Sequence, residues 1–418
     1  MTRTIFGRLF LIIGLAFVLN ACGDDDASGV TAVAQKEETS SSAEQPAEPN
    51  AKQPPLKTEE MGRVETLPAD YPEHWFLVFD LAFFHMLEGR TIVVDALGKS
   101  IPEQFKGSFN VSFGGSIARS DLRNELYAAE TFYTRGNRGT RTDVVTIYDT
   151  ATLEPVDEIV WPKPKRYNGM PQRYALTLID NDRLLLAFNL DPATSVTVFD
   201  VEARKVLNEV ATPGCSLIYP TGERGFTSIC SNGGLMSTQL KADGTIAEQT
   251  RVKPFFSSDT SPIFERAAVI DGMAYFPSFD GRLHPINLKG NVARVGEAWH
   301  LVPEAERGEN WRPGGIGMID KDSNGRFYIL MHPDGGDGTH NAGGTEVWVF
   351  DPAAKKRVSR IELANWGLSI AVGGGEEPLM MVTNETMALD VYRVASGEHL
   401  RTIDGIGQET PLMLHGIK

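Results

Sequence analysis

The chain has 418 residues, with 40 Lys or Arg against 55 Asp or Glu, so its formal net charge is −15. This acidic balance excludes a typical nucleic-acid binder, because such a protein needs a basic face to neutralise phosphates. With 41% hydrophobic residues, 41 Gly, 24 Pro and only 3 Cys, the composition indicates a turn-rich globular protein and excludes a disulfide-dense small scaffold.

The N-terminal segment, residues 1–21, has the pattern of an export signal. Arg3 and Arg8 precede an apolar stretch, residues 9–19, that is too short to span a bilayer. The segment ends in Leu19-Asn20-Ala21-Cys22, which resembles the bacterial lipobox, where the cysteine is lipidated and becomes the mature N-terminus. Asn20 is an unusual occupant of its position, and the alternative is an ordinary cleaved signal with an incidental cysteine. We interpret residues 1–21 as a lipoprotein signal peptide and Cys22 as the lipidation site.

Residues 22–66 differ sharply in composition from the rest of the chain. From residue 23 onward they hold 10 acidic and 4 basic residues, no aromatic residue, and many Ser, Ala, Pro and Gln. Such a segment cannot bury enough apolar area to offset the entropy lost on ordering. It is predicted to be a disordered acidic tether, which leaves the protein in the periplasm and held to a membrane by its lipid.

Residues 67–418 are predicted to be an all-β domain. Short β-branched and aromatic runs alternate with Gly, Pro, Asp and Asn, and several runs end in an aromatic-Asp pair, as in VVTIYD, SVTVFD and EVWVFD. Equivalent strand ends recur every 40 to 63 residues, at Asp95, Asp149, Asp200, Leu240, Leu288, Asp351 and Tyr392. These seven positions predict a seven-bladed β-propeller of four-stranded antiparallel blades, with six or eight blades as alternatives because Leu240 and Leu288 are weaker matches.

Cys215 and Cys230 are the two cysteines inside this domain. They are separated by 14 residues, and in an exported protein this favours a disulfide. The alternative is a pair of free thiols. It is disfavoured because the spacing is not C-x-x-C and because no Lys or His nearby in the sequence would lower a thiol pKa.

Two local patterns imitate metal sites. The sequence from Asp320 to Gly325 resembles the start of a calcium loop, but Met331 stands where a bidentate Glu is needed, so a hairpin turn is the better interpretation. His332 and His340 flank a Gly-rich loop without the spacing of a zinc site. We therefore predict no metal site and no catalytic residues in this chain, which has the character of a binding or assembly partner.

Several longer motifs resemble the heavy chain of quinoprotein amine dehydrogenases, and among them the aralkylamine (aromatic amine) dehydrogenases most. The likeness runs in order from Trp75 to His415, about four-fifths of the chain. The segments that carry it are TRGNRGTRTDVVTIYD (134–149), ATSVTVFD (193–200), residues 214–240 with both cysteines, WRPGG (311–315), and MHPDGGDGTH (331–340) followed by TEVWVFD and KKRVSRI.

The resemblance implies a seven-bladed propeller that pairs with a small light chain in a heterotetramer of two heavy and two light chains. The light chain of that family holds the tryptophan tryptophylquinone cofactor and the catalytic base. Primary amines, here aromatic ones, are deaminated to aldehyde and ammonia, and the electrons pass to a periplasmic cupredoxin. No cofactor is implied for the heavy chain itself. In DLAFFHML (80–87), Phe83 aligns with the phenylalanine that lines the substrate channel, although its residue type alone favours a core aromatic.

Three departures from the family pattern keep a second function open. The chain carries a lipoprotein-like N-terminus in place of a simple cleaved signal. The compact Arg-Gly-x-Arg motif is expanded to Arg135-Gly-Asn-Arg138-Gly-Thr-Arg141, and Ser216 stands where the family tends to have tryptophan. The chain is therefore expected to be either an enzyme subunit that is active only with its light chain or a non-catalytic, lipid-anchored propeller that binds a ligand or a protein partner.

Overall fold

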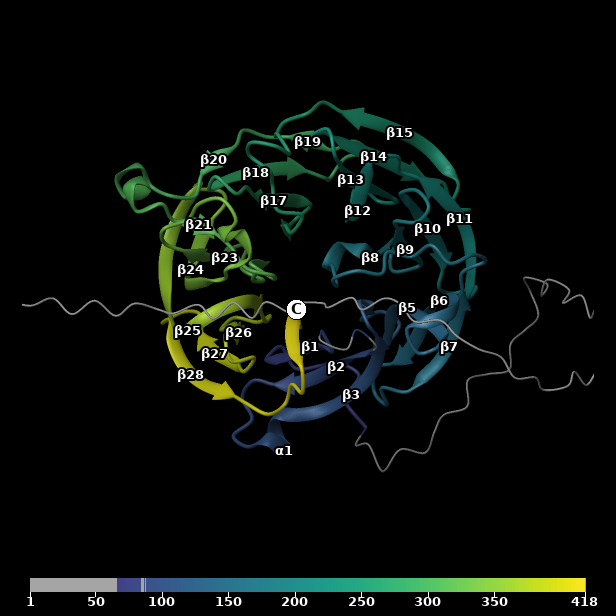
Figure 1. Cartoon of the computed structure of the whole chain (residues 1–418), viewed down its shortest axis with the longest axis horizontal. Coiled ribbons are helices and arrows are strands. Elements are labelled where there is room, and N and C mark those ends of the chain that lie inside the picture. The colour runs from purple at the N-terminus through teal and green to yellow at the C-terminus, as the bar shows by residue number, and fades with distance from the viewer. Residues whose placement is uncertain (1–65, 84–85, 87, 418) are drawn as a thin grey trace, which may run out of the picture. The chain divides into compact units, whose positions relative to one another are not determined.

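The computed structural model describes residues 66–83, 86 and 88–417. The predicted signal peptide, the lipidation site Cys22 and all of the predicted tether except Thr66 lie outside these residues. The described chain is almost entirely β-structure arranged as a ring of radiating sheets (Figure 1). Its helical elements are the short α1 (Ile101–Gln104) and three 3-10 turns, η1 (Arg173–Ala175), η2 (Glu304–Glu309) and η3 (Thr339–Asn341). In this part of the chain no helix is long and apolar enough to cross a bilayer.

The first blade joins the two ends of the described chain. Its innermost strand, β29 (Thr410–Gly416), comes from the C-terminus and pairs with β1 (Trp75–Leu81), which is followed by β2 (Glu88–Asp95) and β3 (Phe105–Ser112). Figure 1 shows the yellow C-terminal strand beside β1 near the centre of the ring. Because strands from opposite ends of the sequence complete one sheet, the ring is closed by backbone hydrogen bonds.

The next blades follow in chain order around the ring. The second consists of β4 (Ser116–Ser120), β5 (Glu125–Arg135), β6 (Arg138–Asp149) and β7 (Pro155–Val160); the third of β8 (Leu176–Ile179), β9 (Leu184–Asn189), β10 (Ser195–Asp200) and β11 (Lys205–Ala211); and the fourth of β12 (Cys215–Pro220), β13 (Gly225–Cys230), β14 (Leu235–Leu240) and β15 (Ile246–Val252). The fifth has β16 (Ala268–Ile270), β17 (Met273–Pro277), β18 (Arg282–Asn287) and β19 (Arg294–Val295), and β20 (Trp299–His300) also pairs with β18.

The remaining strands form one continuous sheet of eight. They are β21 (Arg312–Pro313), β22 (Ile319–Lys321), β23 (Phe327–His332), β24 (Gly344–Asp351), β25 (Lys356–Val372), β26 (Leu379–Asn384), β27 (Leu389–Arg393) and β28 (Glu398–Ile403). Strand β25 has 17 residues, and it pairs with β24 through its first half and with β26 through its second half. No break in the strand divides these two groups of hairpins into separate sheets.

The all-β propeller predicted from the sequence is present, but the predicted number of seven four-stranded blades is wrong. In the described chain five blades have a path of four strands, and one sheet of eight strands completes the ring. The seven strand ends used for the count do recur at equivalent places, yet Asp351 and Tyr392 belong to the same sheet. The spacing of these residues therefore gives the number of repeated hairpins and not the number of separate sheets. Whether two such hairpins separate into two sheets depends on a break in the connecting strand, and β25 has none.

The aromatic-Asp pairs end strands for a local physical reason. At Asp149 one carboxylate oxygen, Oδ1, accepts the backbone N–H groups of Ala151 and Thr152 at 3.0 and 2.8 Å. Asp200 does the same for the two residues that follow Val201. Such a side chain satisfies turn N–H groups that leave the ladder, so the strand stops and the chain reverses.

The core lies between the faces of neighbouring blades. One cluster, for example, is built from buried residues of β5, β6, β9 and β10, among them Tyr127, Val145, Ile147, Leu185 and Phe199. Since both faces of the inner strands are covered, these strands are apolar on both sides and lack the alternation of a half-exposed strand. Packing between blades therefore holds the sheets at fixed angles, and it leaves the loops at the two ends of the ring to form surfaces.

Candidate functional site

One end of the ring carries most of the motifs that the sequence analysis singled out. Successive strands alternate in direction, so the loops joining the second and third strand of each blade lie at the same end as the connections between blades. Arg166, in the β7–β8 connection, shows this directly. Its backbone oxygen accepts Arg141 NH2 from the β5–β6 hairpin at 2.7 Å, and its own NH1 donates to Gly114 O in the β3–β4 turn at 3.1 Å. We call this end the hairpin face.

Phe83 lies on the hairpin face, in the loop that joins β1 to β2. Its backbone N–H donates to Leu81 O at 2.7 Å, which turns the chain sharply at the end of β1. The side chain is 38% exposed. Phe83 is therefore not the core aromatic that its residue type alone would favour. It stands at the surface, where a channel-lining residue must be, and its contribution to a channel stays a prediction.

Other exposed apolar side chains accompany Phe83 on this face. Met86 lies in the same loop, Phe132 lies near the tip of β5, and Leu190 follows β9. They are 56%, 47% and 52% exposed, and they come from three consecutive blades. Exposed large apolar side chains that lie close together on one surface are typical of a protein interface.

The expanded Arg-Gly motif forms the tip of the long β5–β6 hairpin. Arg135 pairs with Arg138 at the end of the ladder, and both side chains are exposed. Arg141 turns back and binds Asp143 through two hydrogen bonds of 2.9 and 3.0 Å. The motif therefore divides into two solvent-facing cations at the tip and one arginine that anchors the base.

Asp143 and Arg166 fix the base of this hairpin against the next blade. Asp143 is fully buried and its Oδ2 accepts the backbone N–H groups of Lys165 and Arg166 at 2.7 and 2.8 Å. Arg166 is also buried, donates to Thr131 Oγ1 at 3.1 Å, and has its pKa lowered to about 10 by burial. A buried charged network with this many hydrogen bonds is rigid, so the hairpin projects in a fixed direction. No motif in the sequence marks the role of either residue.

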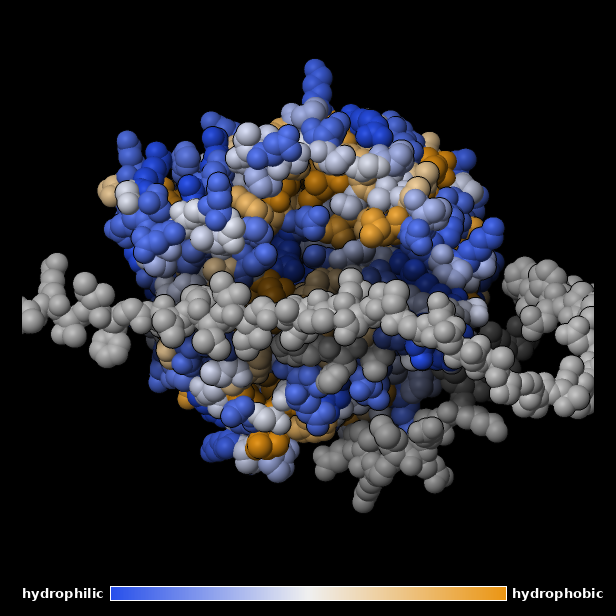
Figure 2. Space-filling view, in the orientation of Figure 1, coloured by the Kyte–Doolittle hydropathy of each residue, from blue (hydrophilic) through white to orange (hydrophobic). Residues whose placement is uncertain are grey.

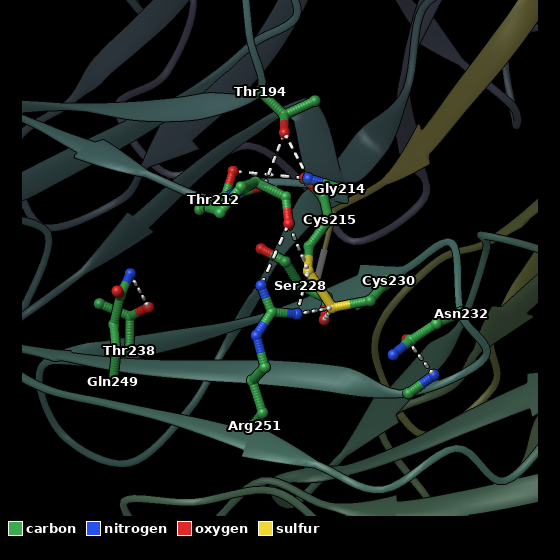
Figure 3. Close-up of a disulfide and its surroundings, with 12 residues drawn as sticks. Thr194, Thr212, Gly214, Cys215, Ser228, Cys230, Asn232, Thr238, Gln249 and Arg251 are labelled. Atoms are coloured by element: carbon green, nitrogen blue, oxygen red, sulfur yellow. Dashed lines mark hydrogen bonds between the residues drawn. A yellow bond between two sulfur atoms is a disulfide. The ribbon is translucent and has the colours of Figure 1, made fainter.

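The disulfide predicted between Cys215 and Cys230 is present on the same face, across the start of β12 and the end of β13 (Figure 3). The two half-cystines are 1% and 3% exposed. Arg251 lies against them, with NH1 3.8 and 4.0 Å from the two sulfur atoms and NH2 3.3 Å from Pro213 O. Both sulfurs are shielded from solvent, so the bond has a structural role.

The loop that contains His332 and His340 is also on the hairpin face. His332 is 2% exposed and its Nε2 is 2.9 Å from Thr339 Oγ1, and burial lowers its pKa. The ring of His340 stacks on Phe279 at 4.5 Å, and its backbone oxygen accepts Gly315 N–H at 2.8 Å. The two histidines therefore order the loop and join it to the WRPGG segment. Within the described residues no group of three or more His, Cys, Asp or Glu side chains is placed to hold a metal ion.

The centre of the ring is crossed by an ion pair. Arg173 NH1 lies 3.0 Å from Asp320 Oδ1, and Arg173 NH2 donates to Leu414 O at 3.1 Å. Arg173 and Asp320 line a cavity of about 320 Å³ together with Tyr174, Lys321 and His415. Figure 2 shows the hollow at the centre of the ring. The Arg173–Asp320 pair spans the central channel, and no short-range sequence pattern pointed to it.

The calcium-like segment is a hairpin turn, as predicted. Strand β22 ends at Lys321 and β23 begins at Phe327, with these two residues opposite each other. Asp322 Oδ1 accepts the backbone N–H groups of Asn324 and Arg326, each at 2.9 Å. The acidic residues that imitate a metal loop therefore bind backbone donors or, in the case of Asp320, the arginine of the channel.

Comparison with known proteins identifies a family. The model of the methylamine dehydrogenase heavy chain family matches residues 78–415. The chain is 29% identical over 283 residues to the methylamine dehydrogenase heavy chain of Paracoccus versutus, covering 67% of this chain and 66% of that one. It is 26% identical over 341 residues to the corresponding chain of Methylorubrum extorquens, covering 80% of this chain and 79% of that one.

A solved structure is similar in fold alone. It belongs to a Bacteroides fragilis protein described as a candidate 6-phosphogluconolactonase, with a TM-score of 0.56 and 11% identity over 82% of this chain and 98% of that one. At this identity the likeness concerns the arrangement of the strands and carries no information on activity.

Proposed function

The chain belongs to the methylamine dehydrogenase heavy chain family, and from this premise we propose that it is the heavy subunit of a periplasmic amine dehydrogenase that depends on tryptophan tryptophylquinone. The complex would oxidise primary, aromatic amines to aldehyde and ammonia and pass the electrons to a cupredoxin. The match over residues 78–415 carries this proposal, because it reaches strands of every sheet of the ring.

The hairpin face supports a light-chain partner. Its exposed apolar side chains, Phe83, Met86, Phe132 and Leu190, lie on three consecutive blades. Docking a small subunit there would remove these side chains from water, which is favourable by about 25 cal/mol for each Å² of apolar surface. The rigid, cationic tip of the β5–β6 hairpin stands beside them and gives the surface a polar rim, as protein interfaces have.

The quinone is proposed to reside in the partner, because the tryptophans of this chain do not suit it. The two closest indoles, Trp311 and Trp348, have ring centroids 5.2 Å apart. They are only 7% and 0% exposed, and their Nε1 groups donate to Glu309 and Glu346 at 2.8 and 2.7 Å. A quinone must be reached by amine and by the electron acceptor, and this pair is sealed by the sheet. Bound in the partner, the cofactor would take up the electrons released from the amine.

What this chain contributes is position and an apolar wall. Phe83, held at the end of β1 by its backbone contact with Leu81, would form one side of the channel and exclude water from it. An aromatic wall favours an aromatic substrate, since ring–ring contacts add about 0.5–1.5 kcal/mol beyond simple burial. The disulfide agrees with the periplasm, because such bonds persist in oxidising compartments.

The proposal is tested by affinity purification of the tagged protein from its native cells. We expect a small cysteine-rich chain to copurify and to show a quinone absorbance band that bleaches on addition of a primary aromatic amine. Mass spectrometry of the N-terminal peptide tests the lipid on Cys22 in the same sample. A lone chain without chromophore or amine response would refute the enzyme-subunit proposal.

A second function is favoured by the departures on the hairpin face. Arg135 and Arg138 enlarge the hairpin tip, and Ser216, next to the disulfide, stands where the resemblance leads one to expect tryptophan. The alternative is therefore a non-catalytic, lipid-anchored propeller that binds a ligand or another protein. A neighbouring gene for a short cysteine-rich chain with two suitable tryptophans would favour the enzyme subunit, and its absence would favour the alternative.

A further inference from the structure

The fifth blade has an interrupted outer strand. Strand β19 pairs with Ile286 and Asn287 of β18, and β20 pairs with Arg282 and Leu283. Between them, residues 296–298 leave the ladder, and the N–H of Gly296 donates to Pro285 O at 2.8 Å. Figure 1 labels β18, β19 and β20 next to one another at the top of the ring. A cavity of about 510 Å³ lies against this interruption.

Two polar side chains of β18 line the cavity. Arg282 and His284 are two residues apart, so they point to the same face of the strand. The exposed fraction of His284 is 7%, so the side chain is more than nine-tenths buried. Within the described part of the chain, neither Arg282 Nε nor His284 Nε2, both buried, has a hydrogen-bond partner. A buried polar atom without a partner is costly and points to a group that is supplied from outside.

Asp280 is the acidic residue of the cavity, and its capacity to accept hydrogen bonds is largely used. Ser278 Oγ, the Ser261 side chain and the backbone N–H of Arg282 all bind its carboxylate, and although burial opposes this, the hydrogen bonds lower its pKa. These hydrogen bonds favour the ionised carboxylate, whose charge offsets that of Arg282. What remains without a partner is Arg282 Nε, whose N–H is a donor, and His284 Nε2, which donates or accepts according to the tautomer of the ring. A single negative charge on a ligand fits this balance better than a double one.

The rest of the lining is mostly apolar, with the hydroxyl groups of Ser257 and Ser261 as exceptions. The rings of Phe255 and Phe256 meet edge to face with centroids 5.0 Å apart, and the Phe255 ring lies 5.6 Å from the ring of His284. Val295 and Ala298 also line the cavity. Planar apolar groups pack well against aromatic rings, and the planar fork of an arginine matches a carboxylate through two parallel hydrogen bonds.

We propose that this cavity is a binding site for a small monocarboxylate with an aromatic body, whose carboxylate is held by Arg282 and whose ring packs against Phe255 and Phe256. The site lies in this chain alone, so it does not rest on the proposed enzyme function. An amine of the same shape cannot form the paired hydrogen bonds that the Arg282 guanidinium makes with a carboxylate, because both groups would be donors.

The test is binding of 4-fluorophenylacetate to the full-length chain, purified with any partner that it retains, followed by fluorine NMR. We expect saturable binding with a Kd below about 1 mM. Arg282→Gln should weaken it by about tenfold or more, since it removes a charge-assisted pair of hydrogen bonds. The matched control is Arg294→Gln, an exposed arginine on β19 of the same blade that does not line the cavity and should leave the Kd unchanged.

A second variant guards against loss of the fold. Ala298 is half-buried and lines the cavity, so Ala298→Phe places a large side chain in the cavity without changing its charge. This variant should not bind the carboxylate, and its circular dichroism spectrum should match that of the wild type. Competition with phenethylamine should have no effect. Absence of saturable binding to the wild-type chain, equal displacement by the amine, or an unchanged Kd in folded Arg282→Gln would each overturn the proposal.

Discussion

Arg173 and Asp320 are 147 residues apart in the sequence, yet Arg173 NH1 is 3.0 Å from Asp320 Oδ1 across the centre of the ring. Asp320 Oδ2 also accepts the backbone N–H of Val372 at 2.9 Å, and Arg173 donates to Leu414 O. One ion pair therefore connects the 3-10 turn η1 with β22 and β25 of the eight-stranded sheet and with β29 of the first blade.

Asp320→Asn should destabilise the propeller. The Asp320 side chain is 1% exposed and the Arg173 side chain is 28% exposed. Asparagine carries no charge, so the substitution removes the anion that pairs with Arg173. Because one end of the pair is partly solvated, we expect the free energy of unfolding to fall by about 2 kcal/mol, below the range for a fully buried pair. Urea unfolding measures the change. The control is Glu297→Gln, which breaks an exposed pair with Lys355 and should change stability by less than about 0.5 kcal/mol.

The disulfide should stabilise the folded protein because it lowers the conformational entropy of the unfolded chain around the fourth blade. Cys215 and Cys230 are 15 residues apart, and for a loop of that size the chain-entropy model gives about 3 kcal/mol. The double variant Cys215→Ala/Cys230→Ala should therefore unfold at lower urea concentration than the wild type. Reductant added to the unfolding series should bring the wild type to the variant's stability and leave the variant unchanged. A variant as stable as the oxidised wild type would contradict this account.

Glu130 should make stability depend on pH between about 4.5 and 6. The residue is 1% exposed, and burial raises its pKa to about 6 despite hydrogen bonds from neighbouring groups that lower it. The folded state therefore holds the proton more tightly than the unfolded chain does. The stability that protonated Glu130 contributes is complete below the unfolded pKa and is lost as the pH rises through 6.

The matching variant is Glu130→Gln, which keeps the shape of the side chain but cannot ionise. At pH 7.5 the free energy of unfolding of the variant should exceed that of the wild type by about 2 kcal/mol. The difference should vanish near pH 4, where Glu130 of the wild type is protonated. Urea unfolding at several pH values measures both. An equal difference at every pH would show that the substitution acts through packing and not through the charge.

Phe83→Ala should impair the proposed amine dehydrogenase without affecting the fold. Its side chain is 38% exposed, so its removal leaves no buried cavity. In the complex with the light chain we expect the KM for an aromatic amine to rise by about three- to tenfold, as for the loss of one apolar contact. The matched control is Phe105→Ala, which is also 38% exposed but begins β3 at the other end of the ring. Equal effects of the two substitutions would refute a channel role for Phe83.

The local pattern of the sequence was sufficient for the strands and for much of the candidate site. Short apolar runs bounded by turn residues, and the aromatic-Asp pairs at their ends, predicted the strands, because both features act over only a few residues. The same holds for the turn after Asp320 and for the half-cystines, which lie opposite each other on adjacent strands. The longer motifs predicted the family, and the structure gathers Phe83, the Arg-Gly hairpin, the disulfide and the histidine loop on one face.

The tertiary structure decided what local pattern could not. The grouping of hairpins into sheets depends on whether β25 bends or breaks between its two partners, and this is settled by packing on both sides of the strand. The pairs Arg173–Asp320 and Asp143–Arg166 and the cavity beside Arg282 and His284 arise where blades meet or a strand is interrupted. Residues that are distant in sequence come together there only when the ring closes, so no short-range spacing encodes them. The sequence determined the repeating unit, and the closure of the ring determined which side chains face one another.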